Sequence, residues 1–163
     1  TDTEIQRIEA ILGWLEANPR SSLYPRQLPI AGVDTKWLEN RKGLIGDLFA
    51  TLSTDTNTTA DFFECCGLRR TPYLVRVRIL DKDIRKYVGG IGDISAPADE
   101  LAKLDMPVRH AFIVENLQTG LAFDDIPESV VFMRLGYDVE VLSRMTWLRG
   151  ARCIYWGDID THG

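Results

Sequence analysis

The chain has 163 residues, of which 45% are hydrophobic and 26% charged, and its formal net charge is −5. This composition is typical of a globular protein and argues weakly against a general affinity for nucleic acid. No apolar run approaches the roughly 18 residues that span a bilayer, so we expect no membrane partner. The N-terminal stretch is acidic and lacks the basic start and continuous apolar run of a signal peptide, so we expect a cytoplasmic protein.

The charge is unevenly distributed. Residues 1–90 hold 13 Lys and Arg against 12 Asp and Glu, whereas residues 91–163 hold 6 against 12. A local basic stretch between residues 65 and 90 makes this part of the chain a candidate contact for DNA phosphates. Its basic residues are Arg69, Arg70, Arg76, Arg78, Lys82, Arg85 and Lys86.

The three cysteines, Cys65, Cys66 and Cys153, have no zinc-binding spacing. We expect buried, reduced thiols.

Helical patterns dominate the first part of the chain. Apolar residues at helical spacing predict a helix over residues 3–17, which Asn18-Pro19 ends. A second helix is predicted up to residue 52, with Asp34 or Thr35 as its N-cap. A short helix over residues 59–66 follows, and Gly67 stands where a left-handed C-terminal glycine is favoured.

Residues 73–81 alternate in polarity, with Tyr73, Val75, Val77 and Ile79 on one face and Arg76 and Arg78 on the other. This pattern predicts a half-exposed strand. Two helices followed by a basic strand and the Gly89-Gly90 turn are compatible with a winged helix that contacts a phosphate backbone. A solvated strand face without any ligand is the alternative.

From residue 97 the pattern becomes an alternation of strands and helices, which predicts a parallel sheet covered on both faces. We place the change between about residues 88 and 105. The predicted elements are a short helix over residues 97–104, strands over 108–115, 129–135 and 152–158, and a helix over 139–148.

Two of these strands end in carboxylates: Glu115 follows one apolar run, and Asp158 and Asp160 follow another. In an open parallel sheet, ligands collect at the carboxyl ends of the strands. Asp158 and Asp160 are about 6.6 Å apart along an extended chain and point the same way. Such a group of hard oxygen ligands favours Mg²⁺ or Mn²⁺ and phosphoryl chemistry. His162 is a further candidate ligand, and a helix cap or turn is the alternative role for the acidic pair.

A strand ending in "IVEN" (113–116) and a later strand ending in "YWGDIDTHG" (155–163) resemble the Toprim domain of the JetD family. This family is the nuclease-like component of the Wadjet anti-plasmid systems and is related to the A subunit of topoisomerase VI. The segment "RQLPIAGVDTKWLENRKGLIGDLF" (26–49) is similar to its N-terminal region. The resemblance implies a mixed α/β chain: an N-terminal helix and linker (1–29), a winged-helix, CAP-like domain (30–95), and a Rossmann-like Toprim domain (96–163) that is incomplete at its C-terminus.

The resemblance also implies a function. Glu115, Asp158 and Asp160 correspond to the catalytic and metal-binding acids of a Toprim endonuclease that uses Mg²⁺ or Mn²⁺. Its partners are double-stranded DNA and a condensin-like SMC complex, and a homodimer is considered. No tyrosine carries a motif for a covalent link to DNA, which favours metal-activated hydrolysis. Members of the family are longer, so the isolated piece is expected to bind metal weakly and to be inactive.

Two alternatives stay open. A non-catalytic winged-helix module would bind DNA or dock other subunits without using Glu115 or Asp158. A phosphatase of the haloacid dehalogenase type shares the D-x-D signature. There the threonine stands two places after the second aspartate, whereas Thr161 follows Asp160 directly.

Overall fold

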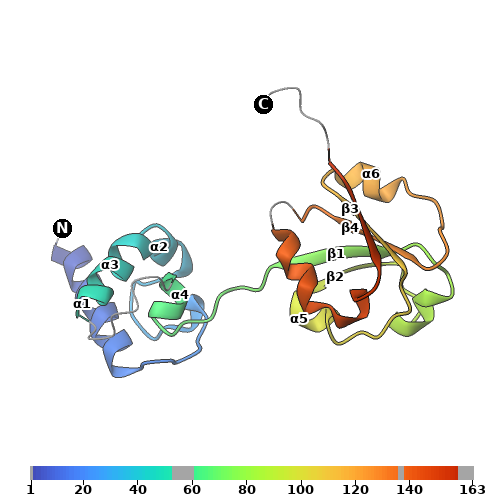
Figure 1. Cartoon of the computed structure of the whole chain (residues 1–163). Helices are drawn as coiled ribbons and strands as arrows, with labels where there is room; N and C mark the ends of the chain where they lie inside the picture. Colours follow the sequence, from blue (N-terminus) through green and yellow to red (C-terminus); the bar gives the residue numbers. More distant parts are fainter. Residues whose placement is uncertain (1, 53–60, 136–137, 158–163) are drawn as a thin grey trace. The chain divides into compact units, whose positions relative to one another are not determined.

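The structure is a computed structural model that describes residues 2–52, 61–135 and 138–157 (Figure 1). The chain divides into two compact units, Thr1–Thr71 (unit 1) and Pro72–Gly163 (unit 2). The described residues contain no helix that is both long and apolar enough to cross a bilayer.

Unit 1 is helical in its described part. Its elements are α1 (Asp2–Ala17), the 3₁₀ turn η1 (Pro25–Gln27), α2 (Thr35–Glu39), α3 (Lys42–Leu52) and α4 (Phe62–Cys65). Ile11 and Leu15 of α1 are fully buried and pack with Leu38 and Ile45 in one core. The predicted apolar stripe packs inward only in part: Leu15 is buried and Ile8 and Leu12 are half-buried, whereas Ile5 is exposed.

The single helix expected up to residue 52 is interrupted. Asp34, one of the two predicted N-caps, is the N-cap and accepts a hydrogen bond from the Trp37 amide at 2.7 Å. The helix breaks at Asn40–Arg41, where the Arg41 amide donates to the Leu38 carbonyl three residues back at 3.0 Å. The Arg41 guanidinium also bonds Glu4 of α1 at 2.6 Å, which ties the break to the first helix.

Gly67 adopts the left-handed conformation expected after α4, with φ of 62°. A Cβ at this position would lie 2.4 Å from the backbone nitrogen of Arg20. Glycine is therefore required here both by the backbone angle and by the close approach of a second segment.

Unit 2 is built on a five-stranded sheet of order β2-β1-β4-β3-β5 (Figure 1). Its strands are β1 (Leu74–Ile79), β2 (Asp93–Pro97), β3 (His110–Val114), β4 (Ser129–Met133) and β5 (Arg152–Trp156). Its helices are η2 (Ile84–Val88), α5 (Ala98–Leu101), α6 (Leu117–Leu121), η3 (Asp138–Arg144) and η4 (Thr146–Leu148).

The sheet is mixed, whereas we expected a parallel one. β3 pairs in parallel with both β4 and β5, but β1 pairs antiparallel with β2 and β4. β2 has no counterpart among the predicted strands. It pairs with β1 as a short edge strand that ends at a proline, and so carries little periodic signal.

β1 also changes the domain organisation. Its alternation is as predicted from Val75 on, with Val75, Val77 and Ile79 buried and the two arginines half-buried on the other face. Tyr73, which we expected on the buried face, precedes β1 and is exposed. We placed this strand in a winged-helix domain over residues 30–95, separate from residues 96–163. In the structure β1 is an inner strand of the unit 2 sheet, and the division falls between Thr71 and Pro72. The described residues of unit 1 therefore carry no wing strand.

Both faces of the sheet are covered. One face packs Val77, Ile113 and Phe132 against residues of α5, η3 and η4. The opposite face packs Val114, Val131 and Met133 against α6 and the segment that follows it. The connection from β3 to β4 thus crosses one face, and the connection from β4 to β5 crosses the other.

Three local expectations are wrong. The α-helix expected over residues 139–148 is a pair of 3₁₀ segments, anchored by the buried Trp147 indole, which donates to the Leu101 carbonyl at 2.8 Å. β5 is largely exposed although its sequence is apolar, because it pairs with β3 at the edge of the sheet. Cys153, on β5, is therefore exposed, although we expected a buried thiol. Cys66 is buried, as expected, and this burial raises the pKa of its thiol to about 12.

Candidate functional site

The carboxyl ends of β4, β3 and β5 lie at one edge of the sheet. The parallel registers pair Val114 with Met133 on one side and with Trp156 on the other. The next residue of each strand is Arg134, Glu115 or Gly157, respectively. Neighbouring strands are about 4.8 Å apart, so these three residues stand in a row along the edge.

The strand order makes one place on this edge favourable for a ligand. The connection from β3 to β4 crosses one face of the sheet, and the connection from β4 to β5 crosses the other face and runs back past β3. The direction in which the chain moves along the sheet therefore reverses between β3 and β5. Ligands of open α/β sheets bind outside the carboxyl ends of the strands at such a reversal. Glu115 directly follows β3, the middle one of the three parallel strands, and therefore lies at this point.

Glu115 is exposed, and one carboxylate oxygen accepts a hydrogen bond from the hydroxyl of Tyr155 on β5. The two residues are close because Tyr155 pairs with Ile113, two positions before Glu115. Gly157 makes room for the tyrosine ring, since a Cβ there would lie 2.7 Å from its Cε1 atom. No Lys or Arg of the described residues forms an ion pair with Glu115.

The other predicted ligands, Asp158, Asp160 and His162, lie outside the described residues. Among residues 2–52, 61–135 and 138–157, no three His, Cys, Asp or Glu side chains gather closely enough to hold a metal ion. The convergence of the three acids therefore stays a prediction, with only Glu115 placed by the structure.

Two residues at this edge, Tyr155 and Arg134, were not among the predicted site residues. A signal for Arg134 was present: it is the first charged residue after an apolar strand, as Glu115 is. For Tyr155 the sequence held no signal, because its contact with Glu115 depends on the pairing of β5 with β3.

The predicted DNA-binding residues are divided between the two units, with Arg69 and Arg70 in unit 1 and the other five in unit 2. In unit 1, Arg69 lies over the Tyr24 ring at 5.3 Å, and Arg70 forms an ion pair with Asp61 at 2.7 Å. Both side chains are exposed. In unit 2, Lys86 is also exposed and lies over the ring of Tyr87 at 5.7 Å.

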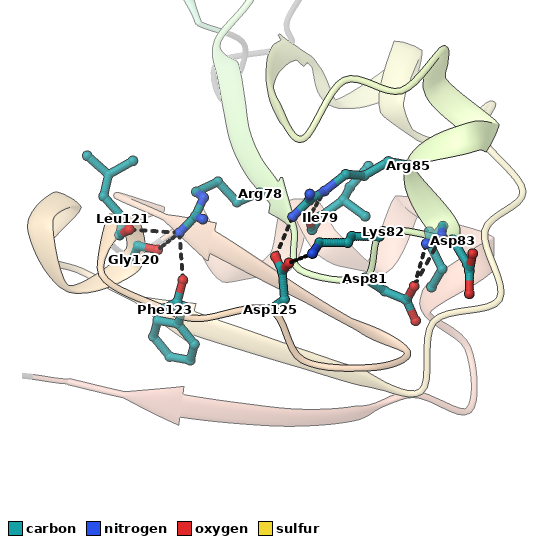
Figure 2. Close-up of polar contacts among 11 residues, drawn as sticks. Arg78, Ile79, Asp81, Lys82, Asp83, Arg85, Gly120, Leu121, Phe123 and Asp125 are labelled. Atoms are coloured by element: carbon teal, nitrogen blue, oxygen red, sulfur yellow. Dashed lines mark hydrogen bonds and ion pairs between the residues drawn. The ribbon is translucent and has the colours of Figure 1, made fainter.

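Of the predicted DNA-binding residues, Arg76, Arg78 and Arg85 are half-buried and bonded within unit 2. Figure 2 shows Arg78 and Arg85. Arg76 forms two hydrogen bonds with Asp93, of 2.7 and 3.0 Å, and this contact lowers the pKa of the Asp93 carboxyl. Arg78 donates through Nη1 to three carbonyls at the end of α6. These belong to Gly120 at 2.7 Å, Leu121 at 2.9 Å and Phe123 at 3.3 Å.

Arg85 binds the Ile79 carbonyl at 2.9 Å and the Asp125 carboxylate at 2.7 Å. Asp125 also pairs with the exposed Lys82 at 3.2 Å, and these two cations lower the pKa of its carboxyl (Figure 2). These half-buried arginines thus hold β1, α6 and the following loop together.

These observations define an α/β protein with a mixed sheet and a candidate ligand site at the carboxyl ends of its parallel strands. Residues 67–163 match the family described as Wadjet protein JetD, C-terminal. Residues 1–50 match a second family, described as an uncharacterized protein conserved in bacteria, N-term (DUF3322). No curated protein matches the chain.

The first match covers more than half of the chain, so the chain belongs to the family of the Wadjet protein JetD. The expected family is thereby confirmed. The two matches follow the structural division, since one lies within unit 1 and the other coincides closely with unit 2. Membership in this family suggests a role in anti-plasmid defence within a multi-component system.

Proposed function

We propose that this chain carries the catalytic edge of a metal-dependent DNA endonuclease that cleaves plasmid DNA in bacterial defence, together with a condensin-like SMC complex. The supporting observation is the position of Glu115. It follows the central parallel strand β3, and the neighbouring parallel strand β5 leads through Gly157 into Asp158 and Asp160. This register supports a site at the edge where Glu115 lies, with Asp158 and Asp160 as its proposed further members.

The chemistry of Glu115 fits a divalent cation. Its carboxylate has no cationic partner among the described side chains, and its hydrogen-bond donor is the neutral Tyr155 hydroxyl. Hard carboxylate oxygens are ligands that Mg²⁺ and Mn²⁺ prefer. Glu115, Asp158 and Asp160 would hold the metal. When bound, it would neutralise charge on the phosphodiester and lower the pKa of a bound water.

The reaction is the hydrolysis of a phosphodiester. The oxygen of a water molecule attacks phosphorus, one P–O bond to a sugar breaks, and the leaving oxygen takes up a proton. Within the chain, Tyr155 orients the Glu115 carboxylate, and the edge position of Glu115 gives a large substrate direct access. An exposed site at the edge of a sheet suits duplex DNA better than a small substrate that must be enclosed.

Four of the seven basic residues remain suited to phosphate contact. Arg76, Arg78 and Arg85 use their guanidinium groups within unit 2, whereas four side chains stay exposed. We propose that DNA affinity depends mainly on these four, which are Arg69, Arg70, Lys82 and Lys86.

The test is the nicking of supercoiled plasmid by the intact protein with its partners in the presence of Mn²⁺. Loss of a residue that hydrogen-bonds to a metal ligand typically reduces metal affinity or activity roughly 10–100-fold. Glu115→Ala and Asp158→Ala each remove a proposed ligand itself, so each should reduce nicking by more than this. Glu100→Ala is the matched control, because Glu100 is an exposed glutamate of α5 paired with Lys103. Nicking that persists in both acid variants would reject the proposed function and favour a non-catalytic DNA-binding module.

A further inference from the structure

Arg134 is the first residue after β4 and adopts a backbone conformation that a non-glycine residue rarely takes. Its φ is 57°, in the left-handed region, where the Cβ atom crowds the following carbonyl. Two hydrogen bonds hold it there. Its amide donates to the Val114 carbonyl at 3.0 Å, and its own carbonyl accepts from the Tyr73 hydroxyl at 2.9 Å. Strained residues that are fixed in this way are found preferentially at functional sites.

The hydrogen bond to Val114 places Arg134 beside the candidate site. Val114 immediately precedes Glu115, and the register pairs it with Met133, which immediately precedes Arg134. Arg134 and Glu115 therefore leave neighbouring strands, about 4.8 Å apart, at the same edge of the sheet. Among the described arginines, Arg134 is the one that directly follows a parallel strand.

The side chain of Arg134 also differs from most arginines of unit 2 in its partners. Arg76, Arg85, Arg109 and Arg144 each pair with a carboxylate within 3.2 Å, and Arg78 binds carbonyls. Arg134 is exposed, and within the described part of the chain it forms no ion pair. A guanidinium that has no carboxylate partner can bind a phosphate with two parallel hydrogen bonds. Judged by the described residues, Arg134 has such a guanidinium, at the same edge of the sheet as Glu115.

The other end of β4 offers an internal comparison. Glu128, directly before the strand, is also left-handed, with φ of 54°. Its carboxylate, however, pairs with Arg109 at 3.0 Å. The strained backbone at Glu128 thus accompanies an internal ion pair, whereas Arg134 is exposed and follows the strand next to that of Glu115.

We propose that Arg134 binds the scissile phosphate of DNA at the candidate nuclease site. Its guanidinium donates hydrogen bonds to non-bridging phosphate oxygens, on which negative charge concentrates during attack by water. This inference rests on the proposed function and extends it to a residue other than the three acids. Because charge develops on those oxygens in the transition state, loss of the guanidinium should reduce kcat more than it weakens DNA binding.

The decisive variant is Arg134→Gly in the intact protein. Glycine favours φ of 57°, so the thermal midpoint should rise by a few degrees, roughly 2–5 °C. Plasmid nicking should nevertheless fall by on the order of 100-fold. DNA affinity should also be measured without metal at several salt concentrations. The slope of log affinity against log salt concentration should become less steep by about 0.9, the value for one phosphate contact. Arg134→Lys, which keeps the charge without the planar fork, should retain intermediate activity.

Glu128→Gly is the matched control, since it relaxes the same strain at the opposite end of β4. It should leave nicking and the salt slope unchanged. Wild-type nicking in Arg134→Gly, with Glu115→Ala inactive, would overturn the role of Arg134 and leave the proposed function standing. Nicking by Glu115→Ala at the wild-type rate would reject the proposed function itself. A lowered thermal midpoint together with lost activity in Arg134→Gly would show a structural role and overturn the inference.

Discussion

Replacing Arg78 with methionine tests whether this arginine stabilises unit 2 or contacts DNA. We expected Arg78 on a DNA-binding strand face, but its Nη1 atom is bonded to three carbonyls at and after the end of α6 (Figure 2). The last carbonyls of a helix have no partners within the helix. Arg78 supplies those partners from β1.

The expected loss follows from these contacts. A hydrogen bond involving a charged group contributes about 1.5–3 kcal/mol net. One nitrogen serves all three acceptors and the guanidinium is only half-buried, so we expect a total loss of about 2 kcal/mol on Arg78→Met. For a domain of this size that corresponds to a decrease in Tm of roughly 8–16 °C.

Arg76→Met is the matched control, because Arg76 lies two residues away on the same face of β1 and forms a surface ion pair with Asp93. Such pairs contribute little, so its Tm should decrease much less. Calorimetry of the whole chain gives the midpoint of unit 2. Hydrogen exchange of peptides covering residues 117–126 should show faster exchange in Arg78→Met alone. Equal stability of the two variants, or a reduced salt slope of DNA affinity in Arg78→Met, would refute this reasoning.

Three further predictions concern single groups. The Glu128 amide, which donates to Asp81 at 2.6 Å, lowers the pKa of the Asp81 carboxyl. Wild type should therefore be more stable than Asp81→Asn at pH 7, and this difference should diminish as the pH falls below about 4, towards the lower pKa of the folded state. Equal denaturation midpoints at pH 7 would contradict it. Tyr155→Phe should reduce nicking about 10-fold and raise the Mn²⁺ concentration needed, because Glu115 loses its positioning hydrogen bond; an unchanged metal titration would count against this. Gly67→Ala should destabilise unit 1 by at least about 2 kcal/mol in urea unfolding, since φ of 62° is unfavourable and the new Cβ meets backbone. Gly90→Ala, with φ of 86° and open space around it, should cost less.

Local patterns predicted much of the secondary structure. The alternation of β1, the apolar stripe of α1, the Asp34 cap and the left-handed Gly67 depend on neighbours within a few residues, and all are present. The position of Glu115 directly after β3 was equally readable, because a strand of continuous apolar residues ends at its first charge. These features follow from the chain's own periodicity and stereochemistry, before any long-range contact forms.

The partners of these elements were decided only by the tertiary structure. The sequence places β1 next to the helices of unit 1, yet β1 pairs with β4, more than 50 residues further along the chain. The same pairing commits Arg78 to the end of α6 and takes it out of the expected wing. Tyr155 contacts Glu115, and Arg134 follows the strand next to that of Glu115, only because β4 and β5 flank β3. Strand order depends on burying both faces of one sheet at once, and that condition involves distant segments together, so no local window of the sequence contains it.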